Sequence, residues 1–531
     1  MQPVATFELI LALLAAAMAL HWLAARARLP PSAMLLVGGG ALAFVPGLPA
    51  ITLDPELILV VFLPPLLMDG AYYTAFGRFR RHLPGILSLA VGAVIFTTLI
   101  VGVVTHWLVP QLPWAACFAL GAIVSPPDAI AARAVLQRVT LPRRLRALLE
   151  GESLLNDATG LVLFGFAVAA TLTGAFDAGA AVVSFAFLAF GGAAVGGMVA
   201  FGFMFVMKRL GDGTLFVASA TLLCWAAYLA GEALHASGVI ATVTAGIVFG
   251  WHQHVMMPAS VRLQGGAFWR TLVFTLEALV FILMGLSMRQ ALGRVGGINE
   301  VLTTLAAPVL GVVVVVIVVR FVWVFGSEAI LSALRAFGAP AAMPLGWRQA
   351  SIVGWTGMRG VVTLAIALTL PEAMPGRDFM LITAFAVILV TVVVQGSSLA
   401  TVIRLVRPVD ADPPAPMSLA AAEAAVARAK LAAAERDAYS TDGQLIHPQL
   451  LETYTARARA TERFANDADA FMDDIRPHFD LMLVAIADGR SELIRLHRDG
   501  QIEDEVLHDL ERDLDIEEMS IVFQRGDAVT R

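Results

Sequence analysis

Polar side chains interrupt the first half of an otherwise apolar, helix-length segment, residues 148–167. They are Glu150, Glu152, Ser153, Asn156 and Asp157. A helix would place Ser153, Asn156 and Asp157 on one face, because they are three and four residues apart. A hydroxyl, an amide oxygen and a carboxylate are hard donors of the kind that a small cation prefers. A carboxylate at membrane depth costs about 2.5–3.5 kcal/mol, so Asp157 is predicted to have a function there; the alternative is a structural acid paired with an Arg.

The whole chain has the composition of a membrane protein. Of its 531 residues, 58% are hydrophobic and 15% are charged, and the mean hydropathy is +0.79. These values predict a polytopic membrane protein rather than a soluble domain. Cys117 and Cys224 both lie in apolar runs, so we expect core thiols rather than a disulfide or a metal site.

Apolar runs long enough to cross a bilayer as helices occur about thirteen times along the chain. They are residues 5–25, 31–48, 54–75, 83–108, 112–134, 148–174, 179–207, 213–234, 236–251, 266–288, 300–332, 347–371 and 378–405. The sequence therefore predicts an all-α membrane fold. The short run at 236–251 requires a tight turn at His235, and the long run at 300–332 is expected to break near Gly326.

Cationic residues follow the odd-numbered runs. Arg78, Arg80 and Arg81 follow the third run, and Lys208 with Arg209 follows the seventh. Even-numbered connections are poor in cations. The positive-inside rule then makes the odd connections cytoplasmic, with the N-terminus outside and the C-terminus in the cytoplasm.

Two of the predicted helices look interrupted inside the membrane. Pro126 and Pro127 stand beside Asp128 in the fifth, and prolines at these positions open a helix. Three glycines in residues 354–360 surround Arg359 in the twelfth. Broken helices at this depth persist where they line a cavity or are buried in protein. The two interrupted helices, the fifth and the twelfth, are seven positions apart in the helix order. This offset suits two inverted six-helix repeats, helices one to six and helices eight to thirteen, in which the interrupted helices occupy the same position. For the glycines alone, close helix packing is the alternative.

Charge divides the chain into two parts. Residues 1–409 carry 23 Lys and Arg against 16 Asp and Glu, whereas residues 410–531 carry 13 against 26. We expect a transmembrane domain over 1–407, a linker over 408–416 and an acidic, mostly helical cytoplasmic region over 417–531. A partly disordered tail is the alternative for that region. The basic footprint of a nucleic-acid-binding protein is missing.

Four segments, in this order and spacing, resemble the monovalent cation:proton antiporter family of bacterial NhaP and animal NHE sodium/proton exchangers. They are Leu-Pro-Pro-Leu-Leu-Met-Asp-Gly-Ala (63–71), Ser-Pro-Pro-Asp-Ala (125–129), Glu-Gly-Glu-Ser-Leu-Leu-Asn-Asp-Ala (150–158) and Gly-Met-Arg-Gly (357–360). The resemblance runs to about residue 405. It implies the NhaA-like antiporter fold, a homodimer in the bacterial plasma membrane, a part in pH homeostasis, no enzymatic activity and no cofactor besides the transported Na⁺ and H⁺.

The resemblance also assigns ligands. It implies that Na⁺ and H⁺ compete for Asp157, and that Asn156 and Ser153 supply further oxygens for Na⁺. Asp69 stands where the family often has Glu and is expected to reach the cation through water. Pro127 replaces a family Thr, which leaves its main-chain carbonyl as the ligand.

The resemblance implies that three further residues, Asp128, Glu152 and Arg359, are structural. Asp128 is expected to cap the ends of the broken helices and oppose a positive dipole. Arg359 is expected to pair with Glu152 as two neutralising buried charges. From the residues alone, Glu277 and Arg320, in the tenth and eleventh runs, are expected to pair with each other and stabilise the scaffold or the dimer; a role in transport is the alternative.

These groups suggest a compact mechanism. Burial favours a protonated carboxyl and a bound cation favours an ionised one, so Asp157 would hold H⁺ or Na⁺ (or Li⁺), but not both. Alternating access would then exchange the ions, and the resemblance implies electroneutral exchange. A K⁺/H⁺ antiporter on the same fold is the alternative. An ion channel, which needs a continuous lined pore, and an intramembrane hydrolase, whose motifs are missing from the sequence, are less favoured.

Overall fold

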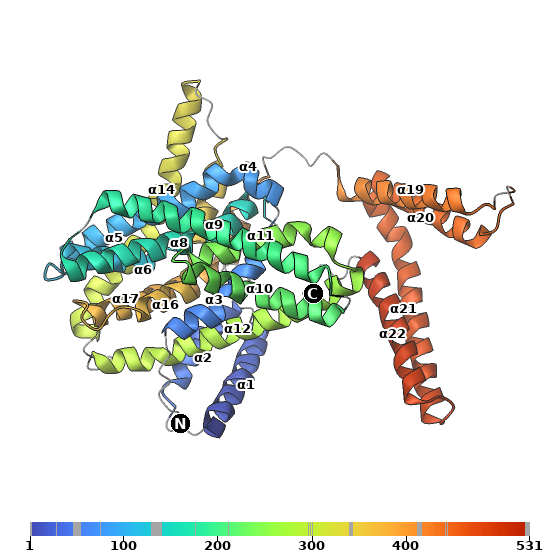
Figure 1. The fold of residues 1–531 in the computed structure, drawn as a ribbon, viewed down its shortest axis with the longest axis horizontal. Helices are drawn as coiled ribbons and strands as arrows, with labels where there is room; N and C mark the ends of the chain where they lie inside the picture. The colour runs from blue at the N-terminus through green and yellow to red at the C-terminus, as the bar shows by residue number, and fades with distance from the viewer. Residues whose placement is uncertain are drawn as a thin grey trace. The chain divides into compact units, whose positions relative to one another are not determined.

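The structure is a computed structural model. The regular elements of its described part are helices, with one isolated bridge between Tyr439 and Leu445 (Figure 1). It describes residues 3–27, 29–45, 55–74, 76–128, 141–175, 177–210, 212–295, 297, 299, 301–338, 343–410, 417–440, 442 and 444–525. Contacts divide the chain into two compact units, Met1–Asp412 and Pro413–Arg531. The all-α membrane fold expected from the sequence is confirmed.

The membrane unit consists of helices and three short π-helical segments. In chain order these are α1 (Pro3–Ala27), α2 (Pro31–Leu42), α3 (Pro55–Tyr72), α4 (Phe76–Leu87), η1 (Ser88–Ala93), α5 (Val94–Leu108), α6 (Trp114–Val124), α8 (Arg143–Thr173), α9 (Ala178–Met207), α10 (Gly213–Ala233), α11 (Gly238–Met256), α12 (Ala259–Arg294), η2 (Val301–Leu305), α14 (Ala306–Ala336), α15 (Trp347–Trp355), α16 (Val361–Leu368), α17 (Arg377–Val390), η3 (Thr391–Gln395) and α18 (Gly396–Val406). Eight stretches among the described residues are long and apolar enough to cross a membrane. Each of the thirteen predicted runs overlaps one or more of the helices and π-helical segments given above. The count of thirteen crossings stays a prediction.

Both predicted interruptions are present. Helix α6 ends at Val124, and residues 125–128 continue as non-helical chain. Residues 129–134 of the same predicted run lie outside the described part. The twelfth run is split into α15 and α16, which are separated by residues 356–360. The prolines and glycines identified in the sequence therefore mark true ends of helices at membrane depth.

Two local predictions had opposite outcomes. His235 adopts a left-handed conformation with φ of 54° between α10 and α11, which confirms the tight turn. The break near Gly326 is wrong, because α14 passes through this residue without interruption. A glycine costs an exposed helix only about 1 kcal/mol relative to alanine, which the apolar packing of a long helix overcomes.

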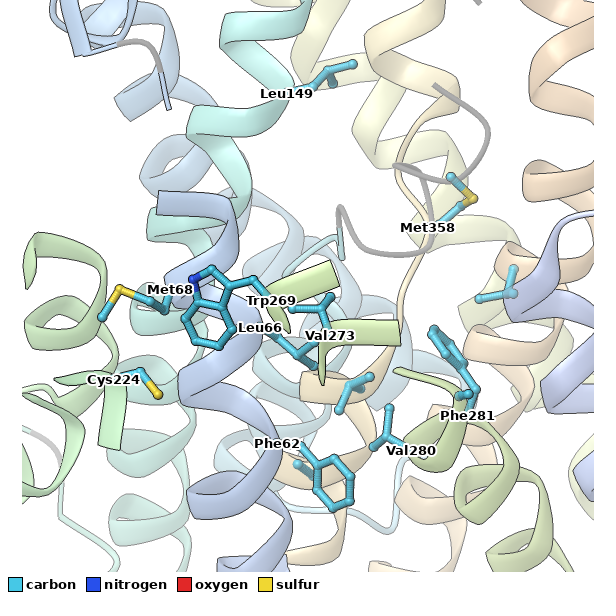
Figure 2. Packing of buried hydrophobic residues seen from close by; sticks show 14 of the residues in the cluster. Phe62, Leu66, Met68, Leu149, Cys224, Trp269, Val273, Val280, Phe281 and Met358 are labelled. Carbon is cyan, nitrogen blue, oxygen red and sulfur yellow. The ribbon is translucent and has the colours of Figure 1, made fainter. Parts of the chain in front are cut away.

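One buried hydrophobic cluster joins α2, α3 and α12 with several neighbouring helices of the membrane unit. Figure 2 shows Leu66 of α3 near Trp269 and Val273 of α12, and Phe62 of α3 near Val280 of α12, all members of one buried cluster. A second cluster joins α6 and α8 with α16 and α17. This second cluster packs α8 against α6 and α16, the helical parts on either side of the interruptions.

The C-terminal unit is a pair of helical hairpins. Its helices are α19 (Leu419–Asp437), α20 (Pro448–Asn466), α21 (Ala468–Arg498) and α22 (Asp504–Arg525). Arg490 of α21 forms ion pairs with Asp515 at 2.6 Å and Glu518 at 2.8 Å on α22. The helical character expected of the tail is confirmed. Residues 411–416 of the expected linker lie outside the described part.

Candidate cation-binding site

Asn156 and Asp157 lie in the middle of α8, buried beside the non-helical end of α6. The side chain of Asn156 is fully buried, and its Nδ2 donates a hydrogen bond to the main-chain carbonyl of Pro127. Its Oδ1 is buried and accepts no hydrogen bond within the described part of the chain. An orphaned buried acceptor of this kind is costly unless another group or an ion binds it.

The carboxylate of Asp157 is 6% exposed, and no described residue donates a hydrogen bond or forms an ion pair with it. Asp128 is close enough to interact with it electrostatically. A buried carboxylate without a donor is unfavourable as an isolated charge. A proton or a bound cation would satisfy a carboxylate in this position. Together with the free oxygen of Asn156, Asp157 forms the acidic part of the site.

The other two candidate side-chain ligands have different surroundings. Ser153 is half-buried one turn before Asn156 on the same helix. Asp69 is half-buried in the last turn of α3, where its carbonyl accepts a hydrogen bond from the Tyr73 N–H at 3.4 Å. The structure therefore places Ser153 with the central pair on α8 and Asp69 on a separate element. Ala129, the end of the fifth-helix motif, lies outside the described residues.

The two broken helices meet at Asp128. Its main-chain N–H donates to the carbonyl of Met358 at 2.6 Å, and its Oδ2 accepts from the N–H of Val361 at 3.1 Å. Val361 is the first residue of α16, so the carboxylate faces the positive end of that helix. A Cβ on Gly360 would lie 1.8 Å from Asp128 Oδ2, so any side chain there would displace the Asp128 carboxylate.

Arg359 stabilises the opposite helix end. Its Nε donates to the carbonyl of Val124 at 2.8 Å, and its Nη2 donates to that of Ser125 at 3.3 Å. Val124 is the last residue of α6, where the helix dipole is negative and carbonyls lack intrahelical donors. The main-chain N–H of Arg359 donates to Thr391 Oγ1 at 3.0 Å. A cation thus faces the negative end of α6, while the anion of Asp128 faces the positive end of α16.

Glu152 has a different partner from the one expected. Arg320 Nη1 and Nη2 bind its two carboxylate oxygens at 2.6 and 2.9 Å, and Arg320 Nε donates to the carbonyl of Val353 at 2.9 Å. The expected pairing of Glu152 with Arg359 is wrong, because the main-chain carbonyls of the broken helices bind the Arg359 guanidinium. The expected pairing of Arg320 with Glu277 is wrong for a related reason, since Glu152 takes the guanidinium in a bidentate geometry.

Sequence reasoning missed one residue of the site entirely. Thr391, which supports the main chain of Arg359, begins the π-helical segment η3. A threonine in an apolar run gives no signal of such a role, and a π-helical segment has no reliable sequence signature. The role of Arg320 did have a signal, since it is an isolated cation in a valine-rich span, but spacing alone could not identify its partner.

Known proteins provide an independent comparison. The model of the family described as sodium/hydrogen exchanger, transmembrane, matches residues 9–405. A Mycobacterium tuberculosis protein named as an uncharacterized Na⁺/H⁺ exchanger is 31% identical over 529 residues, which cover 97% of this chain and 96% of the relative. A sodium, potassium, lithium and rubidium/H⁺ antiporter of Bacillus pumilus is 34% identical over 68% of this chain and 56% of its own length.

A solved structure agrees with these relatives on the fold. The sodium proton antiporter MjNhaP1 of Methanocaldococcus jannaschii superposes with a TM-score of 0.59 at 19% sequence identity. The match covers 76% of this chain and all of that structure. The family match, the Mycobacterium tuberculosis relative and the shared fold support the same conclusion. The chain therefore belongs to the sodium/hydrogen exchanger family of multi-pass membrane transporters, which are not enzymes.

Proposed function

We propose that the chain exchanges Na⁺ or Li⁺ for H⁺ by alternating access, and that the cation and the proton compete for Asp157. One observation carries the proposal: Asp157 is a buried carboxylate for which no described residue supplies a hydrogen bond or a counter-charge. Such a group is neutralised by a proton or by a metal cation, and one carboxylate cannot accommodate both. Membership of an exchanger family supports this reading.

The buried charges around the site support one-for-one exchange. Arg320 balances Glu152, while Arg359 and Asp128 oppose the dipoles of two helix ends. These four charges sum to zero, so Asp157 carries the variable charge. A single proton or a single Na⁺ brings the site to neutrality. Because the empty, charged site is unfavourable in a low-dielectric interior, only the loaded forms would change sides.

The remaining ligands would be oxygens beside Asp157. Asn156 Oδ1 is buried and free to coordinate, and Ser153 would add a hydroxyl from the preceding turn. The Pro127 carbonyl already accepts a hydrogen bond from Asn156 but retains a second lone pair. Asp69, from α3, would act through water. A small set of hard oxygens of this kind suits an alkali cation.

A K⁺/H⁺ antiporter is the second candidate. The Bacillus pumilus relative is named for sodium, potassium, lithium and rubidium, so relatives of this chain include a protein named for several alkali cations. We further propose a homodimer in a bacterial plasma membrane, with the N-terminus outside and the acidic C-terminal unit in the cytoplasm. The cations that follow α9, Lys208 and Arg209, support this orientation.

The test is transport by the full chain in proteoliposomes that contain a pH-sensitive dye. Na⁺, Li⁺ or K⁺ is added outside, and the wild type is compared with Asp157→Asn. We expect the wild type to move protons with Na⁺ and the folded variant to be inactive. A response to K⁺ alone would show that the transported cation is K⁺ and would leave the proposed exchange for H⁺ in place. Normal exchange by Asp157→Asn would refute the proposed role of this residue.

A further inference from the structure

A crevice of about 670 Å³ opens where α9, α10 and α11 end on one side of the membrane unit. These three helices pack against one another (Figure 1). The lining residues come from the last turns of α9 and α11 and the first turn of α10, and continue to α12. None of the lining residues belongs to the cluster around Asp157, so the crevice is separate from the candidate cation site.

The walls of the crevice are apolar and face outward. Phe201 and Phe205 of α9 are 57% and 61% exposed, and Val255 of α11 is 93% exposed. Met204 and Phe216 form the buried floor behind them. Exposed aromatic and aliphatic side chains at the end of membrane-spanning helices favour an apolar occupant, such as an acyl chain, over a soluble ion.

Two cations stand at the end of α9, beside the mouth of the crevice. Lys208 lines it directly, and Arg209 follows in the chain. The guanidinium of Arg209 lies 3.6 Å from the ring centroid of Phe205, and its Nη1 donates to the Phe205 carbonyl at 3.0 Å. The apolar span ends at Met207, immediately before these residues. The two positive charges therefore lie where the phosphates of a bilayer begin.

One acid also lines the crevice, but it is already engaged. Asp212 caps α10, and its Oδ1 accepts hydrogen bonds from the N–H groups of Thr214 at 2.7 Å and Leu215 at 3.0 Å. These backbone donors hold the pKa of the Asp212 carboxyl below its usual range. Because the Asp212 carboxylate faces the N-terminus of α10, it offsets the charges of Lys208 and Arg209 only in part.

We propose that this crevice binds one anionic glycerophospholipid. An acyl chain would lie against Phe201, Phe205 and Val255, and the phosphate would bind Lys208 and Arg209. An apolar wall that ends in two cations at headgroup depth matches both parts of such a molecule. A free phosphate ion would match the cations alone, and a zwitterionic lipid would gain less from them.

The test uses the purified full chain in a non-ionic detergent. Phosphatidylglycerol or phosphatidylcholine is titrated, and thermal unfolding and native mass spectrometry report stability and bound lipid. We expect one phosphatidylglycerol per chain and a higher unfolding temperature. For Lys208→Gln/Arg209→Gln, the concentration needed for half of the effect should rise about thirtyfold, because two surface cations that bind the anionic lipid are lost. The swapped variant Lys208→Arg/Arg209→Lys should behave like the wild type.

The matched control is Arg335→Gln/Arg348→Gln, which removes two exposed cations elsewhere on the same unit and should leave the titration unchanged. The proposal is overturned if phosphatidylcholine or inorganic phosphate stabilises the wild type as well as phosphatidylglycerol does. It is also overturned if the Lys208 and Arg209 variant retains phosphatidylglycerol like the control. If the double variant does not fold, the single Lys208→Gln variant is measured against the same two criteria.

Discussion

Removing Arg320 should destabilise the membrane unit by isolating the buried charge of Glu152. The Arg320 side chain is 4% exposed and that of Glu152 is 3% exposed, and two short hydrogen bonds join them. Breaking a buried pair by removing one partner costs about 3–5 kcal/mol. The Arg320→Met variant also leaves the Val353 carbonyl without its side-chain donor. We expect the unfolding temperature to fall by at least about 5 °C.

Removing both charges should restore much of this loss. In Glu152→Leu/Arg320→Met no charge is left uncompensated, and apolar replacement of a buried pair is often neutral or stabilising. Unfolding can be followed with a thiol-reactive dye, because the two cysteines, Cys117 and Cys224, are both buried in the native protein and react only when it opens. Expression and the monodispersity of each variant complete the comparison.

A double-mutant cycle distinguishes the two possible partners of Glu152. Glu152→Gln is combined with Arg320→Met in one cycle and with Arg359→Met in the other, and the coupling free energies are compared. The structure predicts the larger coupling for Arg320, since Arg359 binds main-chain carbonyls instead. A larger coupling for Arg359, or an Arg320→Met variant that unfolds at the wild-type temperature, would refute this reasoning.

Two further substitutions test the contact between the two broken helices and the proposed cation ligand Asn156. Gly360→Ala should abolish transport, because the new Cβ would lie 1.8 Å from Asp128 Oδ2. Gly326→Ala is its control, since nothing lies within 4 Å of a Cβ there, and its transport should match the wild type. Equal transport rates for the two variants would contradict the close contact between Gly360 and Asp128. Asn156→Ala removes the free oxygen and the donor to Pro127, so we expect the KM for the cation to rise about tenfold in a folded protein. An unchanged KM would exclude Asn156 as a ligand.

The interruptions of the helices were predictable because their causes are local. Pro126 and Pro127 remove backbone donors and clash with the preceding turn, so the end of α6 could be located from the sequence. The glycines around Arg359 indicated the gap between α15 and α16 in the same way. Gly326 was misjudged because one glycine in a long apolar helix weakens it without breaking it.

The partners of the buried charges were not predictable, because they depend on how distant helices pack. Glu152 and Arg320 are 168 residues apart, and spacing cannot show which of two buried arginines reaches the carboxylate. The same applies to Thr391, whose hydroxyl is placed by a π-helical segment. The shared face of Asn156 and Asp157 with Ser153, by contrast, was predictable from one helix, because these residues are three and four positions apart.

Proton release on cation binding tests the central claim most directly. The purified protein is held in a weakly buffered solution with a pH dye, and NaCl is added, with choline chloride as the ionic-strength control. We predict that the wild type releases about one proton for each Na⁺ bound, because both ions neutralise the same carboxylate. Asp157→Asn, shown to be folded by its unfolding temperature, should release none. Na⁺ binding by the wild type without proton release, or full release by Asp157→Asn, would contradict competition at this residue.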